Sequence, residues 1–158
     1  VHRMSGVRCI IGDGHEEASV LASVHRVRPE YDIESALKAL VTYAGGEAMT
    51  YEECGHLQPP DDLARGLHLV FERGILGVFG GQVWTSDADG KVTYHEIVAD
   101  RPGGPYGALY AQMLAAMEGK PHYPAFRHGA LDTRIALAAY ASAERATTLD
   151  LRGAQWAI

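Results

Sequence analysis

Two predicted helices and a strand follow one another in the C-terminal third of the chain, and this order constrains the fold more than any other feature. Between residues 106 and 117, apolar side chains recur at the i, i+3, i+4, i+7 spacing of one buried helical face. Gly119 ends this pattern, because glycine readily adopts the left-handed conformation that follows many helices. A second helix is predicted over residues 129–145, where many alanines allow a sheet to approach closely, and residues 147–151 alternate as a strand. This order predicts helices packed on one face of a sheet.

The rest of the chain is predicted to form mainly strands joined by short turns. The predicted strands cover residues 7–11, 47–54, 63–71, 75–84 and 91–98, and helices are predicted over residues 18–25 and 31–41. Residues 86–90 are rich in Asp and Gly and predict a hairpin turn. Because strands joined by hairpins pair antiparallel, the predicted class is α+β, with a mainly antiparallel (mixed) open sheet and helices packed on one face.

Composition and charge exclude several classes of protein. The 158 residues are 47% hydrophobic and 22% charged, which is typical of a globular domain. The net charge of −6 and the lack of a Lys/Arg cluster argue against a nucleic-acid partner. No apolar run approaches the roughly 20 residues of a membrane span, so no membrane partner is expected. Cys9 and Cys54 could form a disulfide, but reduced cysteines in a cytoplasmic protein are the favoured interpretation.

The N-terminal segment has the predicted order in which a dinucleotide-binding unit begins, namely a strand, a glycine-containing turn and a helix. The turn, residues 12–17, does not suit a pyrophosphate. Glu17 replaces the third glycine and would block close packing of helix on strand, while Asp13 and Glu16 add negative charge beside the phosphates. A plain turn is therefore the favoured interpretation, and no cofactor-binding residue is predicted on this chain.

The eight histidines invite a metal hypothesis, but none occurs in an H-x-x-x-H or H-E-x-x-H spacing, and the cysteines form no C-x-x-C. A metal site assembled across the fold stays an alternative, and its candidate ligands are His15, His25, His56 and His68. No serine lies in a G-x-S-x-G motif, so a nucleophilic hydrolase has no support. We predict no metal ligand and no catalytic residue.

Four runs of the sequence carry spacings that occur together in a known family. They are Asp61–Gly74, Tyr106–Pro121, Gly129–Ala143 and Thr147–Leu151. They resemble the C-terminal end of Gfo/Idh/MocA-type oxidoreductases, in which a helix ending a-i-x-G-x-x-P precedes a helix ending A-x-x-S-a and a last strand. The resemblance implies a substrate and oligomerisation domain whose open sheet face pairs with a partner subunit. It also implies that NAD(P) and the catalytic lysine belong to a separate N-terminal Rossmann half, which is expected to be absent from this chain.

Residues 31–41 are similar to that family's H-D-x-D-l-x-r-w-l-x-G helix, which carries the substrate-side catalytic Asp and His. Tyr31 stands in the place of the histidine, Asp32 follows it, and Glu34 stands in the place of the second acid. The resemblance implies that these three residues bind substrate. No Asp-x-x-x-His spacing occurs, so the chain alone is not expected to catalyse hydride transfer.

Other polar and aromatic residues are candidates for ligand binding. Trp84, Tyr94 and His95 fall on neighbouring predicted strands and could form a face for a sugar-like ligand. The same residues suit a sheet-to-sheet contact between two copies of the chain equally well, because Tyr and Trp are enriched at interfaces. His128 lies just before the last predicted helix, where it could contact an anion or lie in a solvated turn.

The favoured function is the substrate-binding and oligomerisation domain of an NAD(P)-dependent oxidoreductase of Gfo/Idh/MocA type, forming a homo-oligomer through its open sheet face. We expect residues 31–152 to form this domain, residues 1–30 to be an N-terminal segment of separate role, and residues 153–158 to be a tail. The alternative is a free-standing, non-redox dimerisation or small-ligand-binding domain. A small metal-dependent enzyme is the third interpretation. The start at Val1 rather than Met favours the first.

Overall fold

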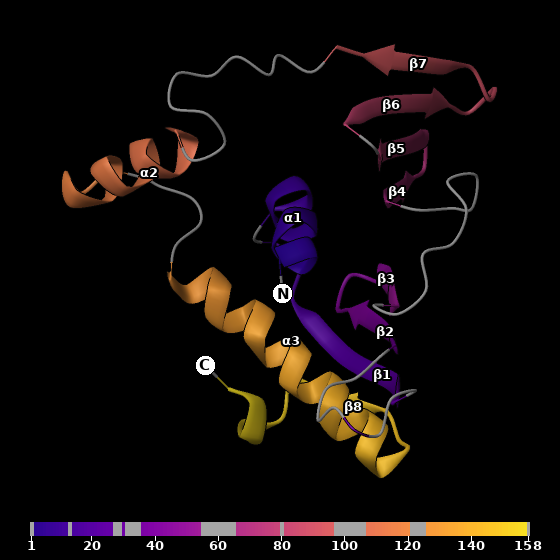
Figure 1. The fold of residues 1–158 in the computed structure, drawn as a ribbon, viewed down its shortest axis with the longest axis vertical. Helices are drawn as coiled ribbons and strands as arrows, with labels where there is room; N and C mark the ends of the chain where they lie inside the picture. Colours follow the sequence, from indigo (N-terminus) through magenta and orange to yellow (C-terminus); the bar gives the residue numbers. More distant parts are fainter. Residues whose placement is uncertain are drawn as a thin grey trace. The chain divides into compact units, whose positions relative to one another are not determined.

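The computed structural model describes residues 2–12, 14–26, 30, 36–54, 66–79, 81–96, 107–120 and 126–157. The chain divides into two compact units. Unit 1 comprises residues 1–58 and 123–158, and unit 2 comprises residues 59–122. Figure 1 labels the helices and strands of both units.

Unit 1 contains a four-stranded antiparallel sheet in the order β3-β2-β1-β8. Its strands are β1 (Glu17–His25), β2 (Ala36–Tyr43), β3 (Ala48–Cys54) and β8 (Leu149–Asp150). Its helices are α1 (His2–Ile11), α3 (Phe126–Arg145) and the short 3-10 helix η2 (Ala154–Trp156). Because β8 pairs with β1, this sheet joins segments from the two ends of the chain.

The core of unit 1 lies between α3 and one face of this sheet. Alternate residues of β1 and β2 point inward, so Val20 lies opposite Val41 and both are fully buried. Ile135, Ala138 and Ala139 of α3 are buried in the same core, and the two alanines let the helix lie close to the strands. Figure 1 shows α3 running along β1. The predicted close approach of an alanine-rich helix to a sheet is confirmed.

Ser142 joins α3 to the strands by hydrogen bonds inside this core. Its Oγ accepts from the backbone N–H of Ala22 at 2.9 Å and donates to the backbone carbonyl of Thr147 at 2.6 Å. β8 pairs only with Ser19 and Val20 of β1. Ser142 therefore supplies the partner that a β1 amide needs beyond the end of β8.

Unit 2 contains an antiparallel meander in the order β4-β5-β6-β7. Its strands are β4 (Leu67–Phe71), β5 (Gly74–Phe79), β6 (Gln82–Asp87) and β7 (Val92–His95), and its helix is α2 (Gly107–Met117). The β6–β7 hairpin turns where predicted. Asp87 Oδ1 accepts hydrogen bonds there from the backbone amides of Asp89 and Lys91, a common role of aspartate in turns.

The predicted α+β class, with antiparallel strands and a helix packed on one face, is confirmed, although the strands form two sheets. The helices predicted over residues 106–117 and 129–145 correspond to α2 and α3. The buried face predicted for the first of them is wrong for its described large side chains. Tyr110, Met113, Leu114 and Met117 are between 53% and 82% exposed. The helical period shows which side chains share a face, but it does not show what covers that face.

Three predictions in the N-terminal part of the chain are wrong. Residues 7–11, predicted as a strand, lie in α1, and residues 18–25, predicted as a helix, belong to β1. Residues 36–41 of the helix predicted over 31–41 belong to β2, and the remainder of that prediction lies outside the described residues. Short apolar runs fit both a helical and a strand period, so pairing with distant segments decides their structure.

The strand predicted over residues 75–84 is in fact two strands, β5 and β6. The chain reverses near Gly81, whose φ of +78° is a conformation that favours glycine. Gly81 therefore belongs to a hairpin turn, whereas Gly77 lies within strand β5.

Of the described helices, α3 is the longest, with 20 residues that include Arg, Asp and Glu. None of the helices in the described ranges is both long and apolar enough to cross a membrane.

Candidate functional site

The residues that the sequence predicts to bind substrate belong to both units of the chain. Trp84 and Tyr94 lie directly opposite each other on β6 and β7 of unit 2. His128 lies in α3 of unit 1, where it is buried. Three further predicted residues lie outside the described ranges: Tyr31, Asp32 and Glu34.

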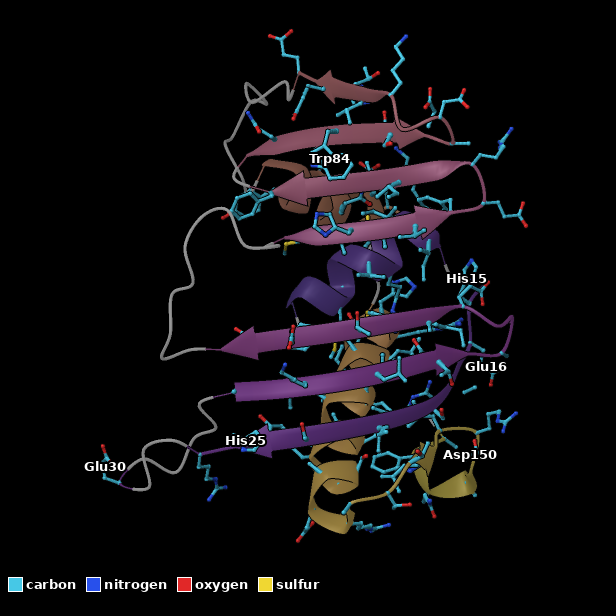
Figure 2. All side chains as sticks on the ribbon, turned by 90° about the vertical axis from the view of Figure 1, so that its right-hand side faces the viewer. His15, Glu16, His25, Glu30, Trp84 and Asp150 are labelled. Carbon is cyan, nitrogen blue, oxygen red and sulfur yellow. The ribbon has the colours of Figure 1, made fainter. Side chains whose placement is uncertain are left out.

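Trp84 and Tyr94 belong to a row of residues that crosses all four strands of unit 2. The row consists of His68 on β4, Gly77 on β5, Trp84 on β6 and Tyr94 on β7, each directly opposite the next. Residues that lie opposite one another share a face of the sheet, and we call this set the aromatic row. The His68 and Trp84 ring centroids are 5.7 Å apart, and Tyr94 is 68% exposed. Figure 2 labels Trp84 on the sheet of unit 2.

Gly77 makes this arrangement of rings possible. A Cβ atom at this position would lie 2.1 Å from Cε2 of Trp84, so the indole occupies the space above the glycine. The absence of a side chain on β5 thus allows Trp84 to reach across that strand to His68 on β4. The row presents aromatic surface to the exterior of unit 2.

His95 lies on the other face of the same sheet. It is opposite Val83, and its Nε2 is 2.8 Å from Oγ1 of Thr85. Because successive strand residues point to opposite faces, His95 and its neighbour Tyr94 project in opposite directions. The structure therefore does not bring Trp84, Tyr94 and His95 together on one face.

A second candidate site is a group of four charged side chains in the interior of unit 1. Arg8 of α1 donates to Oε1 of Glu17 on β1 at 2.5 Å and to Oδ1 of Asp132 on α3 at 3.0 Å. Arg134 of α3 donates to Oε2 of Glu17 at 2.6 Å. Arg8, Glu17 and Asp132 are at most 6% exposed. We call these four residues the charge cluster, in which two guanidinium groups balance two carboxylates.

The electrostatics of the charge cluster favour the protonated form of Arg8. Burial by itself would lower the pKa of Arg8, but the hydrogen bonds and charges of Glu17 and Asp132 outweigh burial and raise that pKa. A guanidinium that stays charged cannot exchange protons at neutral pH. Among the described buried polar atoms, Asp132 Oδ2, Arg134 Nε and Trp156 Nε1 have no hydrogen-bond partner. The cluster is therefore suited to holding three elements together rather than to acid–base catalysis.

The sequence contains one signal for the charge cluster that motif searches miss, namely charged residues at positions where the local period predicts apolar ones. Arg8 lies on the same buried face of α1 as Met4 and Val7. Asp132 lies three residues before the buried Ile135 on α3. A charged residue in such a position needs a partner of opposite charge, although the sequence does not show which residue supplies it.

The turn over residues 12–17 follows a helix and leads into a strand, which reverses the strand–turn–helix order of a dinucleotide-binding unit. Its last residue, Glu17, is buried against the guanidinium groups of Arg8 and Arg134. This segment therefore does not fit a bound pyrophosphate.

The histidines proposed as an alternative metal site belong to different parts of the chain. His25 is the last residue of β1, His15 precedes that strand and lies on the opposite side of the sheet in Figure 2, and His68 belongs to unit 2. His15 Nδ1 is instead 2.9 Å from a carboxylate oxygen of Glu47. His56 lies outside the described residues. Within the part of the chain that the structure describes, no three His, Cys, Asp or Glu side chains are placed to hold a metal ion.

The sequence of α1 and the residue after it share three residue types with the family pattern H-D-x-D-l-x-r-w-l-x-G. In H-D-x-D-l-x-r-w-l-x-G, the histidine, arginine and glycine correspond to His2, Arg8 and Gly12. The two acid positions correspond to Arg3 and Ser5. Residues 36–41 form part of a strand, whereas α1 is a helix that ends at Ile11.

Comparison with known proteins finds no family model and no curated protein that matches this sequence. Solved structures do match its fold. An oxidoreductase from Thermotoga maritima matches with a TM-score of 0.74 and 20% identity, over 94% of this chain and 44% of its own. Aldose–aldose oxidoreductase from Caulobacter crescentus, complexed with glycerol, matches with a TM-score of 0.75 and 15% identity, over 95% of this chain and 45% of its own.

Levoglucosan dehydrogenase, in complex with NADH and levoglucosan, is a third match, with a TM-score of 0.74 and 16% identity. The match covers 96% of this chain and 48% of the dehydrogenase. The chain therefore spans about half the length of the structures that it matches. The likeness shows that this chain has the fold of part of these oxidoreductases.

Proposed function

We propose that this chain is the substrate-binding and oligomerisation portion of an NAD(P)-dependent oxidoreductase of Gfo/Idh/MocA type. One observation carries the proposal. Nearly the whole chain, 94–96% of it, has the fold of about half of each of the three oxidoreductases compared above. The sequence runs that resemble the C-terminal half of this family include those of α2 and α3. Both lines of support concern the same half of such an enzyme.

The cofactor is proposed to belong to the half that this chain does not contain. The chemistry that NAD(P) bound there would supply is hydride transfer. The turn over residues 12–17 supports this assignment, because its helix–turn–strand order and its buried Glu17 do not suit a dinucleotide. The part of the reaction left to this chain is to hold and orient the substrate.

The proposed substrate is a small polyhydroxylated molecule. Two of the matched enzymes have names that refer to carbohydrates, an aldose and levoglucosan. Helix α1 is the proposed substrate-side helix, because it is helical and the histidine, arginine and glycine of the family pattern correspond to His2, Arg8 and Gly12. The substrate-binding roles predicted for individual residues stay predictions.

The open face of the unit 2 sheet is the proposed contact with a second copy of the chain. Val70 and Val92 share this face with Trp84 and Tyr94, and they are 76% and 49% exposed. Exposed apolar and aromatic side chains on one face are typical of protein interfaces. A second copy would cover these side chains by an isologous contact, the commonest arrangement in homodimers.

Two titrations of this chain test the proposal. NADH and NADPH are titrated while nicotinamide fluorescence is followed, and levoglucosan and glucose are titrated by saturation-transfer NMR. The proposal predicts that a sugar binds and that neither cofactor binds. Saturable binding of NADH would show that the chain carries its own cofactor site. Failure of every sugar to bind would remove the substrate-binding role.

A free-standing binding domain without redox activity is the second candidate, and one observation favours it. Both acid positions of the family helix pattern are occupied by other residues in α1, Arg3 and Ser5. The reading frame before Val1 discriminates between the two. A preceding strand, G-x-G-x-x-G turn and helix would favour the oxidoreductase, whereas a start codon immediately before Val1 would favour the free-standing domain.

A further inference from the structure

Helix α1 depends on its neighbours for its helical structure. It has only ten residues, and isolated helices of this length are marginal in water. Gly6 in its middle lowers its helical propensity further. Its described buried side chains are Met4, Val7 and Arg8, which share one face at the i, i+3, i+4 spacing. The helix therefore keeps its form only while this face is docked on the rest of unit 1.

Arg8 makes the directional contact of this face. Its Nε is 3.0 Å from Asp132 on α3, and its Nη2 is 2.5 Å from Glu17 on β1, so one planar group spans two elements. Contacts of Met4 and Val7 are apolar and do not specify a direction, whereas the fixed donors of a guanidinium do. Glu17 is itself held by the second arginine of the charge cluster, at 2.6 Å. Two fixed acceptors thus define the position and the rotation of α1.

We propose that Arg8 is a positioning residue, which fixes α1 against β1 and α3 through the two carboxylates of the charge cluster. The functional meaning of this inference rests on the proposed function, in which α1 is the substrate-side helix. Arg8 does not contact the substrate in this scheme. It determines where the helix that does so lies relative to the sheet. Lysine cannot replace it, because a single ammonium group on a flexible stem lacks the rigid fork that reaches both acceptors.

Hydrogen–deuterium exchange of the full chain tests this inference. In Arg8→Lys, we expect the α1 amides to exchange at least about tenfold faster than in the wild type, because local undocking becomes easier. The amides of β1 and α3 and the urea midpoint should change much less, because the positive charge is retained. Arg8→Met should also accelerate exchange in α1 and should lower the midpoint, because Asp132 then lies buried without its partner. Arg152→Lys is the control, since its ion pair with Asp150 lies on the surface.

If the α1 amides of Arg8→Lys exchange as slowly as in the wild type, the proposal is overturned, because any positive charge at position 8 would then be sufficient to hold α1 in place. Unfolding of all of unit 1 in the lysine variant would also overturn it, because the cluster would then hold the whole core rather than one helix. Hydrogen exchange requires no ligand. The result is therefore independent of the sugar titration, whose failure would affect only the proposed function.

Discussion

Tyr43, on β2, lies within electrostatic range of the charge cluster, and its side chain is 7% exposed. Burial is the largest cause that raises the pKa of Tyr43 from 10.0 to about 12, and the negative charge of Glu17 is the next. A phenolate at this position would lose its hydration and would lie near a carboxylate. Between pH 10 and about 12, Tyr43 therefore keeps its proton in the folded state and releases it in the unfolded state.

We expect this shift to reduce stability at alkaline pH. Because the folded pKa of Tyr43 is the higher one, its contribution is complete below pH 10 and is lost as the pH rises to about 12. The loss amounts to at most about 2–3 kcal/mol, since each pH unit corresponds to about 1.4 kcal/mol. Urea unfolding of wild type and Tyr43→Phe, measured from neutral pH to pH about 12, gives the difference. The variant should lose less stability over this range, and parallel curves for the two proteins would contradict the assignment.

Individual residues show which parts of the candidate sites a sequence can predict. Trp84 and Tyr94 lie on strands joined by a short hairpin, so strand alternation and the turn together place them opposite each other. Arg8 and Asp132 are separated by 124 residues, and no local pattern connects them. Their pairing depends on how α1 docks on α3, which is a property of the tertiary fold. The sequence could therefore predict the aromatic pair but not the charge cluster.

Strands β5 and β6 are matched to each other by a glycine and a tryptophan. Gly77 leaves the space that the indole of Trp84 fills, and His68 lies at the far side of that space. An alanine at position 77 would place its Cβ 2.1 Å from Cε2 of Trp84, well within van der Waals contact of the ring. The strand pair can accept this side chain only if the indole turns away or the strands separate.

We expect Gly77→Ala to displace Trp84 and to destabilise unit 2 by about 1–3 kcal/mol, as in other overpacked sites. The chain has two tryptophans, so the measurement is made in a Trp156→Phe background, where emission reports Trp84 alone. A red shift of this emission and a lower urea midpoint are the expected results. Gly129→Ala is the control, because a Cβ at that helical position meets no atom within 4 Å. Unchanged Trp84 emission in Gly77→Ala would show that the ring does not depend on the glycine.

The elements that the sequence predicts correctly are those whose period is long enough to be unambiguous. α3, with 20 residues, and α2, with 11, each extend over three turns or more. The segments for which helix and strand were confused have eight to ten residues. In β2 the inward residues are Leu37, Ala39 and Val41, and the small side chain of Ala39 makes this strand pattern weak. The spacing of Leu37, Leu40 and Val41 also fits a helix. Sheet pairing with β1 and β3 resolves this ambiguity in the folded chain.

The two units of the molecule differ in how much they bury. Among the residues that the structure describes, every member of the hydrophobic core belongs to unit 1, including Val20, Val41 and Ile135. In the described part of unit 2, Gly77 alone is buried, and it has no side chain. Unit 2 also carries the exposed apolar side chains of α2 and of the aromatic row. Such a unit has apolar surface available for a second copy of the chain.

We predict that the chain forms a dimer through the aromatic row of unit 2. Light scattering on a size-exclusion column should give the mass of two chains for the wild type and of one chain for Tyr94→Glu, because a buried, unpaired carboxylate disfavours the contact. Thr93→Glu is the matched control, since the neighbouring residue of β7 points to the opposite face. A monomeric wild type at every concentration would contradict the proposed interface.

Unit 2 should unfold before unit 1, because apolar burial is the main source of stability and the described residues of unit 2 bury little apolar surface. Each unit carries one tryptophan, Trp84 in unit 2 and Trp156 in unit 1, so Trp156→Phe and Trp84→Phe report the two units separately. We expect the Trp84 signal to change at the lower urea concentration. If a second copy covers the aromatic row, that midpoint alone should rise with protein concentration, since association stabilises the unit that it involves. Coincident transitions would instead show that both units unfold as one cooperative structure, and the difference in burial would then not control stability.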